Sequence, residues 1–150
     1  MGRFVNPDNS AFQAALNSRI YVDKTGLIEK TNAVLDTRQK FLCVSRPRRF
    51  GKSMAADMLA AYYERGEDAD LLFRSLKISK AESYRAHLNQ YDVIKVNIQE
   101  FLSMTGSMDE MLSMLKKYLV FDLMEHFDDI RFRDESNLIQ VMKDIYAKTK

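Results

Sequence analysis

The sequence has a single cysteine, Cys43, so no disulfide can form within the chain. Its apolar residues occur in short runs, and none approaches the roughly 20 consecutive residues that a helix needs to cross a bilayer. No internal repeat or low-complexity segment is present. These absences favour a soluble protein of a reducing compartment, and we expect a cytoplasmic location. We also expect Cys43 to be a buried structural thiol, because it lies within the apolar run of residues 41–44.

The chain is long enough for one ordinary domain, and its composition is enough to form a core. Of the 150 residues 46% are apolar and 11% aromatic. The net charge of +2 is too small to indicate a nucleic-acid partner by itself. Residues 37–56, however, contain no acidic residue and six basic ones, namely Arg38, Lys40, Arg46, Arg48, Arg49 and Lys52. This local charge favours an anionic ligand, either a nucleotide phosphate or a nucleic-acid backbone.

Apolar spacing predicts a helix-rich α/β fold. Two short apolar runs, residues 41–44 and 93–98, are typical of buried strands. Apolar residues at helical spacing predict helices between them and on either side. These helices are expected within residues 7–18, 26–36, 52–65, 68–75, 80–88, 108–130 and 137–150. The alternation predicts an α/β layer structure with a parallel sheet.

The stretch SRPRRFGKS, residues 45–53, follows the first expected strand and precedes an alanine-rich helix. Gly51, Lys52 and Ser53 match the last three positions of the phosphate-binding loop G-x-x-x-x-G-K-[ST]. Arg46 stands where that pattern begins with glycine, and Pro47 lacks an N–H group. Two interpretations therefore remain: a phosphate-binding loop with an altered cradle, or a basic turn that caps a helix.

A second segment makes the pattern more specific. IYVDKTGLI, residues 20–28, followed by SRPRRFGKSMAADMLAAYY, residues 45–63, resembles the predicted AAA-ATPase-like family of microbial proteins. In that family an R-P-R-R-F-G-K-[ST] loop follows a Y-V-D-K-T segment, so Arg46 is a family trait. The resemblance implies a fold of the P-loop NTPase type, here an incomplete three-layer α/β/α arrangement with parallel strands. It also implies ATP and Mg²⁺ as cofactors. Many members carry a nuclease-like domain of the PD-(D/E)XK type downstream, which implies a nucleic-acid partner for the whole protein.

The resemblance also implies roles for single residues. Lys52 would contact the outer phosphates as the catalytic lysine, and the hydroxyl of Ser53 would bind Mg²⁺. Tyr21, Asp23 and Lys24 would flank the base. The expected cofactor-binding residues are Arg46, Pro47, Arg48, Arg49, Phe50, Gly51, Lys52, Ser53 and Met54.

Hydrolysis also needs an acidic residue at the end of a second apolar strand. YLVFD, residues 118–122, has the composition, but it lies inside a long helical pattern and we expect a helix there. The family places its acidic strand after a helix like NLIQVMKDIYAKTK, residues 137–150. We therefore expect residues 1–150 to be the N-terminal part of an ATPase-like domain, weak or inactive in hydrolysis. Alternatives are a nucleic-acid-binding module that uses Arg46, Arg48 and Arg49, and an interaction domain with a non-functional basic loop.

Overall fold

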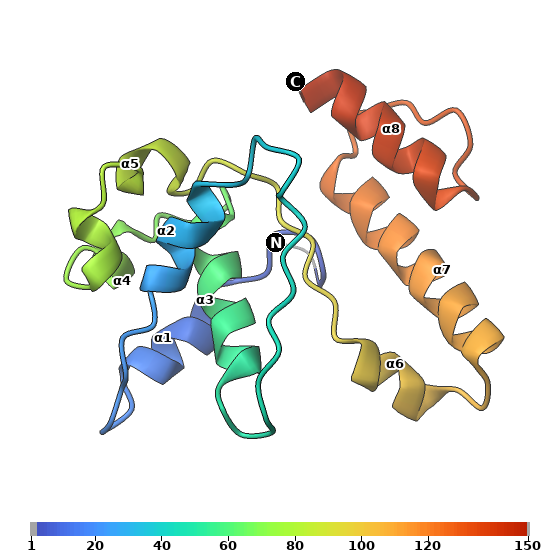
Figure 1. The fold of residues 1–150 in the computed structure, drawn as a ribbon. Coiled ribbons are helices and arrows are strands. Elements are labelled where there is room, and N and C mark those ends of the chain that lie inside the picture. The colour runs from blue at the N-terminus through green and yellow to red at the C-terminus, as the bar shows by residue number, and fades with distance from the viewer. Residues whose placement is uncertain (1–2, 150) are drawn as a thin grey trace. The chain divides into compact units, whose positions relative to one another are not determined.

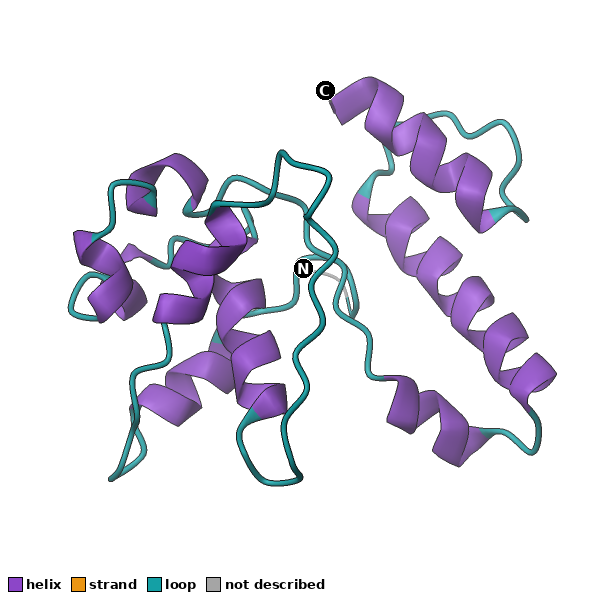
Figure 2. Cartoon of the chain, in the orientation of Figure 1, coloured by secondary structure: helices purple, strands orange, loops and turns teal. Residues whose placement is uncertain are grey.

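The computed structural model describes residues 3–149, and these residues form helices joined by irregular segments (Figures 1 and 2). They belong to two compact units, one formed by Asn6–Val93 and the other by residues 3–5 with residues 94–149. The first unit contains α1 (Ser10–Leu16), α2 (Gly26–Asn32), α3 (Lys52–Tyr63), α4 (Asp70–Phe73), the 3₁₀-helix η1 (Lys77–Lys80) and α5 (Tyr84–His87). The second contains α6 (Ile98–Met104), α7 (Met108–His126) and α8 (Leu138–Thr149).

The first unit is organised around the buried end of α3. The Tyr62 side chain is completely buried, and its ring meets that of Phe73 edge-on at 5.4 Å between centroids. Phe12 from α1 stacks on Phe73 at 4.9 Å. The Tyr62 hydroxyl donates a hydrogen bond of 2.7 Å to the carbonyl of Tyr84, so the polar end of this core residue is satisfied. This core anchors the last turns of α3 and leaves its first turn, which follows the basic loop, at the surface.

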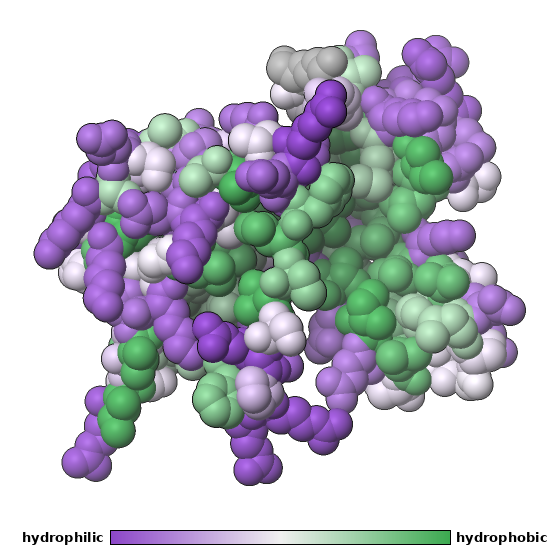
Figure 3. Space-filling view, viewed as in Figure 1, coloured by the Kyte–Doolittle hydropathy of each residue, from purple (hydrophilic) through white to green (hydrophobic). Residues whose placement is uncertain are grey.

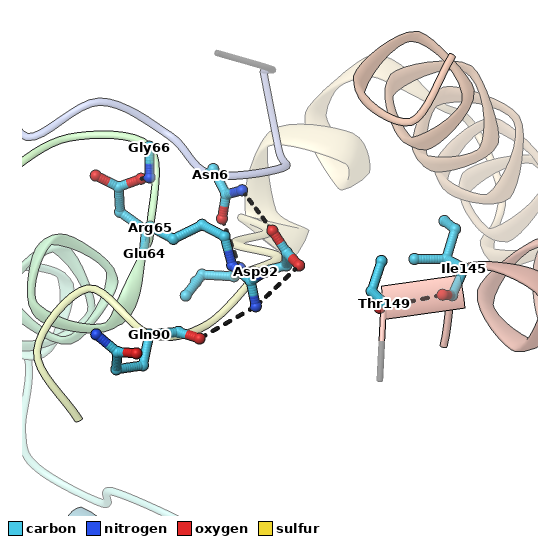
Figure 4. A network of polar contacts seen from close by, with 9 residues as sticks. Asn6, Glu64, Arg65, Gly66, Gln90, Asp92, Ile145 and Thr149 are labelled. Atoms are coloured by element: carbon cyan, nitrogen blue, oxygen red, sulfur yellow. Dashed lines mark hydrogen bonds and ion pairs between the residues drawn. The ribbon is translucent and has the colours of Figure 1, made fainter. Parts of the chain in front are cut away.

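A polar network closes the first unit where its two chain ends meet (Figure 4). The side-chain amide of Asn6 donates to the Asp92 carboxylate at 3.0 Å, and its Oδ1 accepts from the N–H of Val93 at 2.7 Å. Arg65 adds an ion pair of 3.3 Å to Asp92 and a hydrogen bond of 3.1 Å to the carbonyl of Gln90. The network therefore holds both ends of the unit to the segment that follows α3.

The second unit is built on capped helices. Ser107 caps α7 by accepting the N–H of Glu110 at 3.2 Å, and the Glu110 carboxylate accepts the N–H of Gly106 at 3.0 Å. These reciprocal contacts are those of a capping box, which fixes where the helix begins. Asn97 caps α6 in a similar way. Helices α7 and α8 pack around a core to which Val120, Leu123, Val141 and Ile145 contribute.

The predicted three-layer α/β/α arrangement with parallel strands is wrong for this structure. Residues 3–149 contain no sheet, and their strand pairing consists of isolated bridges, Val5 to Ile94 and Glu64 to Tyr91. Residues 41–44 are extended but unpaired, and the second expected strand ends in helix α6. The apolar runs indicated burial, but a strand also needs neighbours that accept its backbone hydrogen bonds. The helices, in contrast, lie within the predicted ranges, apart from α6 and the 3₁₀-helix η1.

The extended run of residues 41–44 is exposed, and the prediction of a buried Cys43 is wrong. Phe41 retains 86% of its accessible surface, and the thiol of Cys43 is exposed. The surface view also shows apolar side chains among hydrophilic ones (Figure 3). No packed layer covers this run within the described part of the chain, so composition alone could not bury it. As for a membrane, no helix within residues 3–149 combines the length and apolar character needed to cross one.

Candidate functional site

The site is a cavity of about 530 Å³ in the first unit, between the start of α2, the start of α3 and the basic loop. Its ionisable lining consists of Lys24, Lys30, Arg46 and Lys52, with no carboxylate among the described lining residues. The remaining lining residues are Gly26, Leu27, Val44, Phe50, Gly51 and Ala55. A cavity lined by four cations and several apolar side chains has the chemistry to hold an anion that also carries an apolar part.

The loop reaches α3 through two residues in the left-handed conformation. Arg49 has φ 66° and Gly51 has φ 79°. The left-handed conformation costs a residue with a side chain about 1–2 kcal/mol, which explains why glycine suits position 51. Gly51 is the N-cap of α3 and provides no side-chain cap. The first N–H groups of α3 therefore lack the usual side-chain acceptor, and a helix end of this kind attracts anions.

Lys52 reaches back across the loop to its beginning. Its ammonium donates a hydrogen bond of 2.6 Å to the carbonyl of Arg46. A turn within the loop adds a contact of 3.4 Å from the Phe50 N–H to the Pro47 carbonyl. The loop therefore curves around the Lys52 side chain. Arg46, which departs from the phosphate-loop pattern, contributes its backbone carbonyl to this contact, and any residue type could do so.

Lys24 reaches the same loop from the start of α2. Its ammonium donates a hydrogen bond of 3.1 Å to the carbonyl of Phe50, 26 residues along the chain. A methyl group added to Gly51 would lie 2.9 Å from this ammonium, so glycine also leaves room for Lys24. Two lysine ammonium groups thus contact backbone carbonyls of one loop.

Residues 23–25 are attached to the 3₁₀-helix η1. The Asp23 carboxylate accepts hydrogen bonds from the Thr25 hydroxyl at 2.6 Å and from the Lys77 N–H at 2.8 Å. The buried Thr25 hydroxyl in turn accepts the Ile78 N–H at 3.1 Å. Burial opposes ionisation of Asp23, but the hydrogen bonds from Thr25 and Lys77 hold the pKa of its carboxyl below the ordinary value.

The structure brings some of the predicted cofactor-binding residues to the cavity lining and leaves others outside it. Arg46, Phe50, Gly51 and Lys52 line it. Within the described residues, its lining does not include Pro47, Arg48, Arg49, Ser53 or Met54, all of which lie in the loop or at the start of α3. Ser53 is exposed in the first turn of that helix.

Of the three residues expected to flank a base, only Lys24 lines the cavity within the described chain. The Tyr21 ring contacts Phe12 at 6.3 Å between centroids, and Asp23 binds η1.

Residues 118–122 are helical, as predicted. They lie within α7, and Asp122 is buried there at 5% exposure. Its carboxylate accepts the N–H groups of Arg3, Phe4 and Val5, each at 2.8 Å. Asp122 therefore holds the N-terminal segment in the second unit and has a structural role.

Sequence reasoning missed Lys30 and assigned no structural role to Asp23 and Thr25. Lys30 lies in α2, where a lysine is ordinarily read as part of the solvated helix face. Its place in the cavity depends on the packing of α2 beside the loop, which helical periodicity does not report. The available signal was the pairing of residues 20–28 with the loop in one pattern, since two segments found together are often neighbours in space.

Comparison with known proteins identifies the family. No curated protein and no solved structure matches the chain. A family model described as "Predicted AAA-ATPase" matches residues 11–150, which include all but the first residue of α1, the helices from α2 to α8 and the whole cavity lining. The chain belongs to this predicted AAA-ATPase family.

Proposed function

We propose that the chain binds a nucleoside triphosphate, ATP, together with Mg²⁺, and that the phosphates occupy the cavity beside Lys52. The observation that carries this proposal is the charge of the cavity: every ionisable residue in its described lining is a cation. A triphosphate is the common cellular ligand whose charge matches several clustered ammonium and guanidinium groups. Membership of a predicted ATPase family supports the same ligand.

The size and remaining lining of the cavity also suit a nucleotide. About 530 Å³ falls within the range of roughly 300–1,000 Å³ found for small-molecule sites. Leu27, Val44 and Phe50 provide apolar surface beside the charged groups. A ligand with a flat, weakly polar base and a charged tail fits both kinds of surface.

We propose that a magnesium ion arrives with the nucleotide and binds at the start of α3, where the exposed Ser53 directly follows the lining residue Lys52. Ser53 would offer its hydroxyl, while the phosphates and water supply the other ligands, as is usual for Mg²⁺. The described residues hold no cluster of three His, Cys, Asp or Glu side chains placed to bind a metal without the nucleotide. When bound, the ion would neutralise phosphate charge and polarise the phosphoryl oxygens.

Hydrolysis by this chain is proposed to be weak. An attacking water needs an acidic or amide group to orient it. The described lining of the cavity contains neither an acidic nor an amide side chain. The one earlier candidate, Asp122, lies in a helix and accepts backbone N–H groups. Binding without rapid turnover is therefore the activity that these residues support.

Calorimetric titration with ATP and Mg²⁺ tests the proposal. Lys52→Ala is expected to weaken binding about 10-fold or more, because charged hydrogen bonds contribute about 1.5–3 kcal/mol. Lys40→Ala is the matched control: Lys40 is exposed, lies near the loop in sequence and does not line the cavity. Equal affinity of the wild type and Lys52→Ala would remove the proposal.

The nucleic-acid interpretation makes the opposite prediction. Arg46, Arg48 and Arg49 are all exposed on the loop, where they are accessible to a phosphate backbone. A salt-dependent affinity for DNA or RNA that vanished when these arginines were replaced, and that ignored Lys52→Ala, would favour that interpretation.

A further inference from the structure

We propose that Lys24 is a positioning residue of the loop: residues 23–25 form a bracket on η1 that directs the Lys24 ammonium onto the Phe50 carbonyl and so holds the loop in shape. The inference deepens the proposed function, on which its nucleotide-binding part rests. It gives a structural role to residues 23–25 of the second segment of the sequence pattern, in which Asp23 and Lys24 were expected to flank the base.

The bracket fixes the backbone on both sides of Lys24. Asp23 binds the N–H groups of Thr25 and Lys77, at 2.9 and 2.8 Å, with its two carboxylate oxygens. Thr25 is completely buried and joins η1 through Ile78. Lys24 itself is exposed, so its neighbours hold its backbone and leave its side chain available. In the segment D-K-T, Asp23 and Thr25 therefore bind η1, while Lys24 between them extends its side chain to the loop.

The contact with Phe50 controls one peptide unit of the loop. Because a peptide group is planar and trans, fixing the Phe50 carbonyl also fixes the direction of the Gly51 N–H. Gly51 is the left-handed N-cap from which α3 begins. Lys24 therefore orients Gly51, the residue from which α3 begins and which directly precedes Lys52.

A simple contribution of positive charge can be separated from this positioning role. Lys30 lines the same cavity and carries the same charge, but it makes no hydrogen bond to the loop within the described chain. Lys24→Met and Lys30→Met remove equal charge, and both residues are exposed. Only the first removes the contact with Phe50. Lys24→Arg keeps both a charge and a donor and should restore the contact.

The first measurement needs no nucleotide. We expect Lys24→Met to speed the initial tryptic cleavage after Arg48 and Arg49 about 10-fold, the change expected from losing one hydrogen bond to a charged group. Lys30→Met should cleave at the wild-type rate, and Lys24→Arg should return close to it. Cleavage after the exposed Arg131, in the other unit, serves as the internal reference. A wild-type rate in Lys24→Met, with the reference unchanged, would overturn the proposal.

The second measurement is affinity for ATP with Mg²⁺. Lys24→Met is expected to weaken binding about 10-fold and Lys30→Met about two-fold, the latter being the size of an exposed charge effect. Equal weakening by both variants would mean that Lys24 contributes charge alone, which would also overturn the proposal. Absence of binding in the wild type would instead refute the proposed function, and the cleavage rates would still decide the role of Lys24. Circular dichroism confirms that each variant is folded.

Discussion

Replacement of Asp122 tests whether this residue is structural. Its carboxylate accepts three backbone N–H groups at 2.8 Å, and two of the donors belong to the buried residues Phe4 and Val5. Asp122→Ala leaves these donors without an acceptor. Each buried unsatisfied donor costs about 1–3 kcal/mol, and the exposed third adds less. We therefore expect the free energy of unfolding to fall by about 4 kcal/mol, a large part of the roughly 5–15 kcal/mol of an ordinary domain.

Urea unfolding followed by circular dichroism measures this loss. Asp122→Asn retains one acceptor oxygen and is expected to lose about half as much. Asp129→Ala is the matched control, since Asp129 is exposed and lies just after α7, and its effect should stay within about 0.5 kcal/mol. A loss below about 1 kcal/mol in Asp122→Ala would refute the reasoning about buried donors. Loss of Mg²⁺-dependent ATP binding in folded Asp122→Asn would refute the structural role itself.

Three further predictions concern single residues of the first unit. Gly51→Ala should weaken ATP binding about 10-fold in a folded protein, because φ 79° strains alanine and the added methyl group displaces Lys24. Gly106→Ala should leave ATP binding unchanged, and calorimetric titration measures both variants. Burial raises the pKa of Glu64. The contribution of the protonated Glu64 to stability is therefore present below the ordinary pKa of 4.5 and is lost as pH rises through the pKa of the folded state. In melting temperatures measured against pH, Glu64→Gln should remove this pH dependence of stability. The exposed Cys43 should react with a thiol reagent in the native protein as fast as in urea, and a requirement for urea would contradict its exposure.

The parts of the structure that depend on residues close together in the sequence were predictable. Helix α7 follows from its apolar spacing, and the cap at Ser107 and Glu110 agrees with its start. The absence of a sheet from the described chain was not predictable, because strand pairing depends on partners distant in sequence, and residues 41–44 lack such partners there. The same limit applies to the cavity. Gly51 and Lys52 are visible as a motif, whereas the contact of Lys24 with Phe50 joins residues 26 apart.

The substitution of arginine for the first glycine of the phosphate-loop pattern is compatible with the loop observed here. Within the described chain, the residues other than glycine that have a positive φ are Asn6, Arg49 and Asn89. Arg46 is not among them, so position 46 does not require the conformation that favours glycine. Arg46 contributes its carbonyl to Lys52, and its side chain adds a cation to the cavity. Arg46→Gly should therefore keep the loop but weaken ATP binding, by about three-fold for one exposed charge, in calorimetry at low salt. Tighter binding by Arg46→Gly would show instead that the arginine obstructs the phosphates and that glycine is the better residue for this position.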